Sequence, residues 1–115
     1  MATTRMAGPY PLMYDSVHAV VPAAAPGVFA LGYTGRDGAF YVNYIGRSDN
    51  DVRTRLLDFI GSDAAFKFDR SRTAEAAFHR ECEVFHAFRP PANRLHPSRP
   101  AATDWRCPRC SFLAW

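Results

Sequence analysis

Two runs near the middle of the chain, Gly27-Val-Phe-Ala-Leu-Gly-Tyr-Thr34 and Phe40-Tyr-Val-Asn-Tyr-Ile45, decide its fold class. Both are rich in the aromatic and β-branched residues that favour strands. Gly35-Arg-Asp-Gly38 lies between them and is typical of a turn, so the two runs predict a β-hairpin. Further along, apolar Phe residues alternate with other residues in Ala65-Phe-Lys-Phe-Asp69, and this alternation predicts a third strand.

Two helices are predicted after this hairpin. Ser48 is followed three residues later by Asp51, a variant capping box that opens a helix, and Gly61 ends that helix. Thr73 can cap a second helix, which Pro90 stops. Apolar residues recur at helical spacing in both: Val52, Leu56, Phe59 and Ile60 in the first, and Phe78, Cys82, Phe85 and Phe88 in the second.

The order β-β-α-β-α predicts an α+β domain, with a small antiparallel three-stranded sheet flanked by helices. We expect this domain to cover residues 27–93. Residues 1–26 contain four prolines and predict an N-terminal arm that packs on the domain, with one short strand around residues 16–21. Residues 94–115 predict a C-terminal tail that carries a CxxC knuckle.

Composition indicates an ordinary soluble protein with a mild basic bias. The net charge is +3, and 13 of the 14 basic residues are Arg, whose guanidinium groups suit phosphate oxygens. A GC-rich genome would explain the arginines equally well. The longest apolar stretch, residues 18–26, is too short and proline-rich to span a bilayer, and the first residues do not resemble a secretory signal. We therefore expect no membrane partner and a cytoplasmic location.

Five features of the region 27–93 form an ordered pattern. Gly27-Val-Phe29 and Tyr44-Ile-Gly46 are two tripeptides, and Arg55, Glu81 and Asn93 follow them. In this pattern the chain resembles the GIY-YIG nucleases. The resemblance implies a divalent-metal-dependent endonuclease that hydrolyses phosphodiester bonds in DNA, with RNA as an open alternative.

The resemblance also implies roles for single residues. Glu81 would bind Mg²⁺ (or Mn²⁺), which acts as a Lewis acid at the phosphate. Tyr44 would orient or deprotonate the attacking water, and Arg55 would donate to the phosphate oxygens. The expected substrate contacts are Arg47, Arg53 and Asn93.

The first tripeptide departs from the family pattern, because Phe29 stands where the family usually has a tyrosine. A phenylalanine has no hydroxyl to position water. Tyr33 lies four residues after Phe29, on the same side of a regular strand, and is the expected substitute in catalysis. Tyr41 lies three residues before Tyr44, so a regular strand would place it on the opposite side from Tyr44.

Cysteine and histidine residues predict a second, structural metal site. Cys107-Pro-Arg-Cys110 is a CxxC knuckle, and Cys82 and His86 stand four apart on one helical face. Together these four could hold zinc tetrahedrally and pin the tail to the second helix. His79 and His96 compete for the place of the fourth ligand, His86. In the alternative interpretation, Cys82 is a small core residue and the CxxC is a free or redox pair.

Two other functions remain open at this point. The chain could be a catalytically weak or inactive nucleic-acid-binding module that kept the nuclease fold. It could also be a zinc-stabilised interaction protein in which the tripeptides are coincidental. The sequence shows no separate recognition domain, so a homodimer or an accessory protein is a further expected partner.

Overall fold

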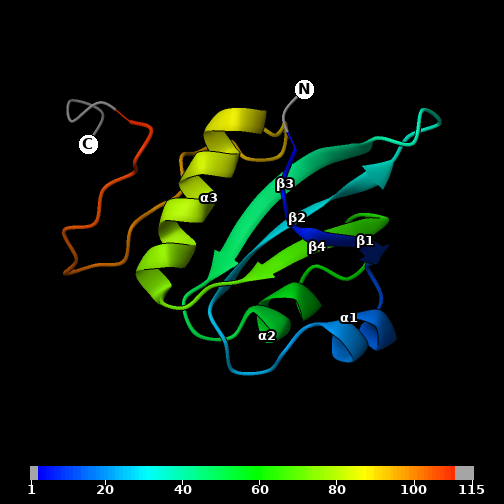
Figure 1. Ribbon diagram of the computed structural model, residues 1–115, viewed down its shortest axis with the longest axis horizontal. Helices are drawn as coiled ribbons and strands as arrows, with labels where there is room; N and C mark the ends of the chain where they lie inside the picture. The colour runs from blue at the N-terminus through cyan, green and yellow to red at the C-terminus, as the bar shows by residue number, and fades with distance from the viewer. Residues whose placement is uncertain (1–2, 111–115) are drawn as a thin grey trace.

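The computed structural model describes residues 3–110 of the 115-residue chain, so residues 1–2 of the arm and 111–115 of the tail lie outside the described residues. Figure 1 shows the elements. In chain order they are β1 (Ala7–Pro11), α1 (Tyr14–Val20), β2 (Gly27–Thr34), β3 (Phe40–Ser48), α2 (Val52–Leu57), β4 (Ala65–Arg70) and α3 (Ala74–Phe88).

The sheet is antiparallel and has four strands in the order β1-β4-β2-β3. The α+β class and the three expected strands are confirmed, but the sheet has one strand more than expected. The additional strand, β1, contains Gly8, Pro9 and Pro11, which are poor strand formers away from an edge. It lies at the sheet edge beside β4, where prolines are tolerated.

The short strand expected around residues 16–21 is wrong, because this part of the arm forms helix α1. Its valines suggest a strand by propensity alone. In the structure Val17 and Val21 stand four residues apart and are both buried in the core cluster shared with α2 and the sheet. Tertiary burial has overridden the local preference.

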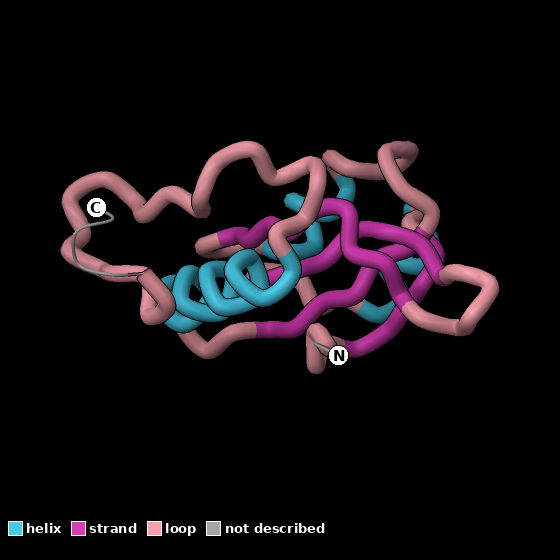
Figure 2. Tube along the Cα trace, turned by 90° about the horizontal axis from the view of Figure 1, so that it is seen from above, coloured by secondary structure: helices cyan, strands magenta, loops and turns pink. Residues whose placement is uncertain are grey.

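Helices cover both faces of the sheet (Figures 1 and 2). On one face, α1 and α2 bury Val17, Val52 and Leu56 against strand residues that include Phe29 and Phe66. On the other face, α3 packs against β2 and β3 through a smaller cluster, which comprises Met6, Val28, Ala30, Ile45 and Val84. Strand β3 is the open edge between the two helical layers.

The β2–β3 hairpin contains a bulge that changes which side chains share a face. Leu31 is paired with Tyr44, whereas the next residue of β2, Gly32, is paired with Val42, so Asn43 is an extra residue on β3. A Cβ on Gly32 would lie 1.9 Å from the carbonyl oxygen of Tyr41, which explains the glycine. Because of the bulge, Tyr41 lies on the same face as Tyr44, contrary to the expectation for a regular strand.

The helix ends agree with the sequence in α3 and differ in α2. Thr73 caps α3 by accepting from the N–H of Ala76, and the helix ends just before Pro90, as expected. Helix α2 is capped by Asp51, and Ser48 instead accepts from the N–H of Asp51. This helix ends at Leu57, and Ile60, expected on its apolar face, is 41% exposed.

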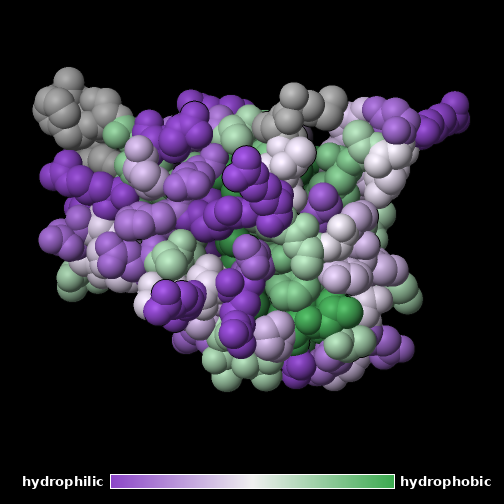
Figure 3. All heavy atoms as spheres, viewed as in Figure 1, coloured by the Kyte–Doolittle hydropathy of each residue, from purple (hydrophilic) through white to green (hydrophobic). Residues whose placement is uncertain are grey.

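Hydrophilic residues dominate the surface over α3 and the segment that follows it, while a hydrophobic patch lies near α1 (Figure 3). Within residues 3–110, no helix combines the length and the apolar character needed to cross a membrane.

Candidate functional site

A cleft of about 310 Å³ opens at the β3 edge of the sheet, where side chains from both helical layers meet. Five of the expected site residues line it. Tyr44 and Arg47 come from β3, Arg55 from α2 and Glu81 from α3, while Asn93 lies in the segment after α3. The other lining residues are Gly46, Asp49, Leu95, His96, Pro97 and Ser98.

Glu81 is the buried acid of the cleft and is paired with Arg47. Arg47 Nη1 donates to Glu81 Oε1 over 2.7 Å, and Arg47 Nε donates to Asp49 Oδ1 over 2.8 Å. The Glu81 side chain is only 9% exposed. Burial raises the pKa of Glu81 above its usual value, although the bond from Arg47 opposes this shift. The carboxylate is therefore held in an environment that disfavours its charge.

Arg47 is fixed on the α3 face of β3. Its guanidinium lies 5.1 Å from the centroid of the Phe78 ring, in addition to its bonds to Glu81 and Asp49. Burial acts to lower the pKa of Arg47, but these two bonds outweigh burial and the pKa is raised. The residue thus carries a permanent positive charge into the cleft.

Arg55 reaches the cleft from the opposite helical layer and is held loosely. Its side chain is 47% exposed and lies 3.5 Å from Asp58, an ion pair that contributes little in solvent. The guanidinium also lies 5.0 Å from the centroid of the Phe59 ring. Arg55 is therefore a cation that can turn toward an anion in the cleft at small cost.

Tyr44 rests on an aromatic layer that consists of the buried Phe29 and the half-buried Phe59. The rings of Tyr44 and Phe59 are 5.2 Å apart, and that of Phe29 lies 5.5 Å from Phe59. Phe29 is fully buried, and a Cβ on Gly46 would lie 2.5 Å from its ring. The glycine of the second tripeptide is thus required by close contact with the last residue of the first.

Asn93 uses its side-chain amide to bind the edge strand. Its Oδ1 accepts from the N–H of Ile45 over 2.7 Å, and its Nδ2 donates to the carbonyl of Ile45 over 2.9 Å. The N–H of Ala92 also donates to the carbonyl of Asn43. These bonds make Asn93 a residue that positions the cleft wall. It also lines the cleft, and its expected contact with substrate stays a prediction.

Two other expected site residues lie away from the cleft. Tyr33 is 53% exposed near the hairpin turn and stacks on Tyr41 with ring centroids 5.4 Å apart. Arg53 donates to the backbone carbonyls of Val21 and His18 at the end of α1. Tyr33 is too far along β2 to replace the hydroxyl missing at Phe29, and Arg53 holds α1 against α2.

Asp49 is a cleft residue that the sequence analysis did not identify. It follows Arg47 by two residues in the turn from β3 to α2 and supplies a second carboxylate, 41% exposed. Its spacing from Arg47 was a usable signal, because alternate residues at a strand end lie on one side.

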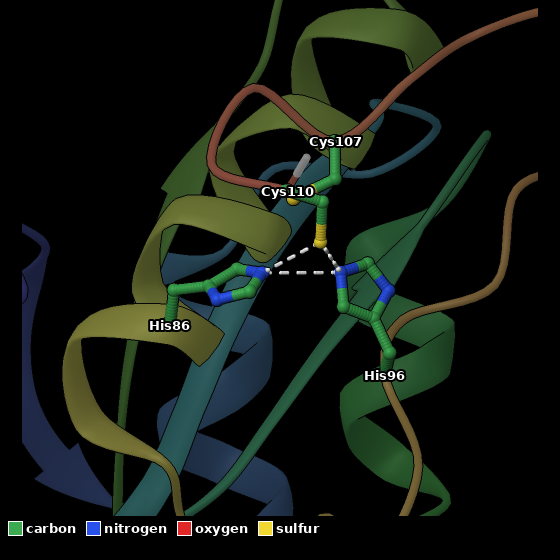
Figure 4. A group of neighbouring side chains, drawn as sticks. All are labelled: His86, His96, Cys107 and Cys110. Atoms are coloured by element: carbon green, nitrogen blue, oxygen red, sulfur yellow. Dashed lines mark hydrogen bonds between the residues drawn. The ribbon is translucent and has the colours of Figure 1, made fainter. Parts of the chain in front are cut away.

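A second group of side chains, next to the cleft, could hold a metal ion (Figure 4). One ligand atom from each of His86, His96, Cys107 and Cys110 lies within 4.8 Å of the others. The Cys110 sulfur is 3.1 Å from His86 Nε2 and 3.2 Å from His96 Nε2, and the two Nε2 atoms are 3.2 Å apart. The knuckle is closed by a bond from the N–H of Cys110 to the carbonyl of Cys107.

This group differs from the expected ligand set in one member, because it contains His96 and lacks Cys82. Cys82 is fully buried in a cluster with Phe78 and Cys107. Burial, with the neighbouring Cys107 thiol, raises the pKa of the Cys82 thiol above its usual value, and the side chain packs as a core residue. His79, the other competing ligand, lies beside Glu75 on α3. His96 was a candidate in the sequence, but only the folded chain shows that its ring reaches His86.

No protein-family model matches this chain, and no curated protein or solved structure matches it either. The functional argument therefore rests on the residues of the cleft and of the His/Cys group.

Proposed function

We propose that the chain is a divalent-metal-dependent endonuclease of the GIY-YIG type that hydrolyses phosphodiester bonds in DNA. One observation carries this proposal. Tyr44, Arg55 and Glu81 line one cleft with Arg47 at the open edge of the sheet, although Tyr44 and Glu81 are 37 residues apart in the sequence. The set combines an acid, two cations and a phenol, which are the groups that phosphodiester hydrolysis needs.

The cleft suits a hard divalent cation. Glu81 and Asp49 both line it and offer carboxylate oxygens, the ligands that Mg²⁺ and Mn²⁺ prefer. Arg47 bonds to one oxygen of Glu81, Oε1, and Glu81 and Asp49 are the residues that would hold the ion. When bound, the ion would stabilise charge on the phosphate as a Lewis acid.

The remaining residues act on the substrate and on water. Arg55 turns from Asp58 to the non-bridging phosphate oxygens, where a well-placed donor typically contributes a factor of about 100 to 1000 in rate. Tyr44 orients the attacking water at the mouth of the cleft. Arg47 favours the ionised form of Glu81 against the effect of burial and holds the side chain in place, because its guanidinium is bonded to that carboxylate.

Phe29 favours a second candidate, a nucleic-acid-binding module with little or no cleavage. The buried phenyl ring supplies no hydroxyl beside Tyr44, and the exposed Tyr33 cannot replace it. Such a module would bind DNA through Arg47 and Arg55 and leave it intact.

Nicking of supercoiled plasmid with Mg²⁺ or Mn²⁺ tests the proposal. We expect cleavage by the native chain and a loss of at least about 100-fold in Glu81→Gln, which keeps an acceptor for Arg47 but removes the charge that binds the ion. Glu83→Gln, on the exposed side of the same helix, is the matched control and should cleave normally. Equal cleavage by both variants would refute the assignment, and binding without cleavage by the native chain would favour the second candidate.

We also propose that the ion at the His/Cys group is zinc with a structural role. Thiolate and imidazole ligands select zinc, whereas the carboxylates of the cleft select magnesium. Four protein ligands leave no position for water or substrate. Metal analysis of protein purified without a histidine tag should find about one zinc per chain.

A further inference from the structure

The His/Cys group and the cleft share one residue. His96 contributes Nε2 to the group and also lines the cleft, together with its neighbours Leu95, Pro97 and Ser98. The group draws its other members from α3 (His86) and from the knuckle (Cys107 and Cys110), as Figure 4 shows. An ion at this position would therefore tie three segments together, and one of them is a wall of the cleft.

The spacing of the donor atoms suits a tetrahedral ion. Zinc bonds to nitrogen and sulfur of about 2.0–2.3 Å put neighbouring ligand atoms roughly 3.3–3.8 Å apart. The three separations among His86, His96 and Cys110 are 3.1–3.2 Å, so a small outward adjustment would admit the ion. Cys107 lies within the same 4.8 Å envelope and is almost fully buried.

The orientation of His96 is set from outside the group. Its Nδ1 lies 2.8 Å from the carbonyl oxygen of Pro97, which can only accept, so Nδ1 carries the proton and Nε2 is left as the ligand atom. The His96 ring also packs edge-on against Phe85, with centroids 5.3 Å apart. A ring oriented in this way presents the correct nitrogen to an ion.

The wall segment 93–98 has anchors at its two ends. Asn93 binds Ile45 of the edge strand at one end, through the two bonds described above. At the other end His96 reaches the His/Cys group and Pro97 is buried. Leu95, between the anchors, is 82% exposed and has little packing to hold it. The geometry of this wall thus depends on what fixes His96.

From this arrangement we propose that the ion held by His86, His96, Cys107 and Cys110 is a clamp that fixes the 93–98 wall and so completes the cleft. DNA cleavage in this cleft rests on the proposed function, whereas the clamp rests only on the His/Cys group and its connection to the wall. Removal of zinc should free the wall while Glu81, Arg55 and Tyr44 stay in place, because those residues belong to the sheet and helices. The zinc would then control the cleft without touching the substrate.

Hydrogen exchange and zinc content of the full chain test the clamp. We compare the native chain with His96→Ala, with His96→Cys, which restores a zinc ligand, and with His79→Ala as the control histidine on α3. The native chain and the control should hold about one zinc and protect the amides of Ala92 and Asn93, whose N–H groups donate to the carbonyls of Asn43 and Pro90 at the start of the wall. His96→Ala should lose zinc and exchange these amides at least about tenfold faster, with β2 protection unchanged as evidence of folding. His96→Cys should recover both properties.

Two results would overturn the clamp: less than about a tenth of an equivalent of zinc in the native chain, or loss of zinc in His96→Ala with no change in exchange at Ala92 and Asn93. Neither measurement uses cleavage. If zinc and exchange behave as expected but no variant nicks plasmid, the nuclease proposal fails and the clamp stands. If plasmid is cleaved and exchange does not respond to zinc, the clamp fails and the nuclease proposal stands.

Discussion

At the scale of single residues, Glu81 shows a conflict between stability and chemistry. The carboxylate is nearly buried, and burial raises its pKa although Arg47 donates to it. A charge in such a place lowers the stability of the fold at neutral pH. A buried acid with a raised pKa that lines a cleft is the kind of residue to which our proposal assigns a cation.

The substitution Glu81→Gln should therefore separate stability from function. The folded-state pKa of Glu81 lies above its unfolded value, so the folded chain binds the proton more tightly, and the contribution of Glu81 to stability falls as the pH rises through that window. Glutamine keeps the acceptor for Arg47 and removes this penalty. We expect Tm at pH 7.5 to be unchanged or raised by roughly 1–4 °C, with the difference vanishing at acid pH.

Thermal unfolding of both forms between pH 4 and 8, without added metal, makes this measurement. A Tm lowered by several degrees at pH 7.5 would mean that the ion pair with Arg47 stabilises the fold and that the carboxylate has a structural role.

At the scale of elements, the edge strand β3 organises the cleft. Tyr44 lies on the α1–α2 face and Arg47 on the α3 face, because residues three apart in a regular strand point to opposite sides, so residues of both layers meet at one edge. On the outer side of this edge strand, the side-chain amide of Asn93 bonds to the N–H and the carbonyl of Ile45, as the backbone of a neighbouring strand would. The segment after α3 is thereby brought to the cleft.

Removal of this pairing by Asn93→Ala should destabilise the chain. The substitution leaves the N–H and carbonyl of the buried Ile45 without their partner, which costs about 1–3 kcal/mol in the free energy of unfolding. Urea denaturation measures the change. Asn50→Ala, in the exposed turn before α2, is the control and should change stability by less than about 0.5 kcal/mol. An equal effect in the two variants would show that the Asn93 bonds contribute nothing specific.

At the scale of the whole molecule, the chain brings together two groups of possible metal ligands that differ in chemistry. The cleft offers carboxylate oxygens, and the neighbouring group offers two imidazoles and two thiols. The ring centroids of Trp105 and Phe78 are 6.1 Å apart, so the segment just before the knuckle also has an aromatic contact with α3. The segment after residue 93 has no helix or strand up to residue 110 and depends on such contacts for its position.

Chelation of zinc should thus lower the stability of the whole molecule. We expect Tm to fall by about 10 °C or more with a zinc-selective chelator, because an ion that binds only the folded state stabilises it by mass action. Added zinc should restore Tm and added Mg²⁺ should not. Restoration by Mg²⁺ alone would contradict the assignment of two sites that differ in kind.

The sequence by itself determined the elements whose signals are local. The β2–β3 hairpin, strand β4 and the long helix α3 follow from residue propensity, turn glycines and the Thr73 and Pro90 boundaries, and their order sufficed for the α+β class. The tertiary structure alone decided the pairing of β1 with β4, the helical state of α1 and the exchange of Cys82 for His96 in the ligand group. Each of these three features depends on burial or on contacts between residues far apart in the chain. A short window of sequence predicts neither burial nor such contacts. Tyr44, Arg55 and Glu81 could be selected from the sequence because they fall in the ordered pattern that resembles a known family. Long-range contacts, in contrast, hold Asp49 in the cleft and place Tyr33 and Arg53 away from it.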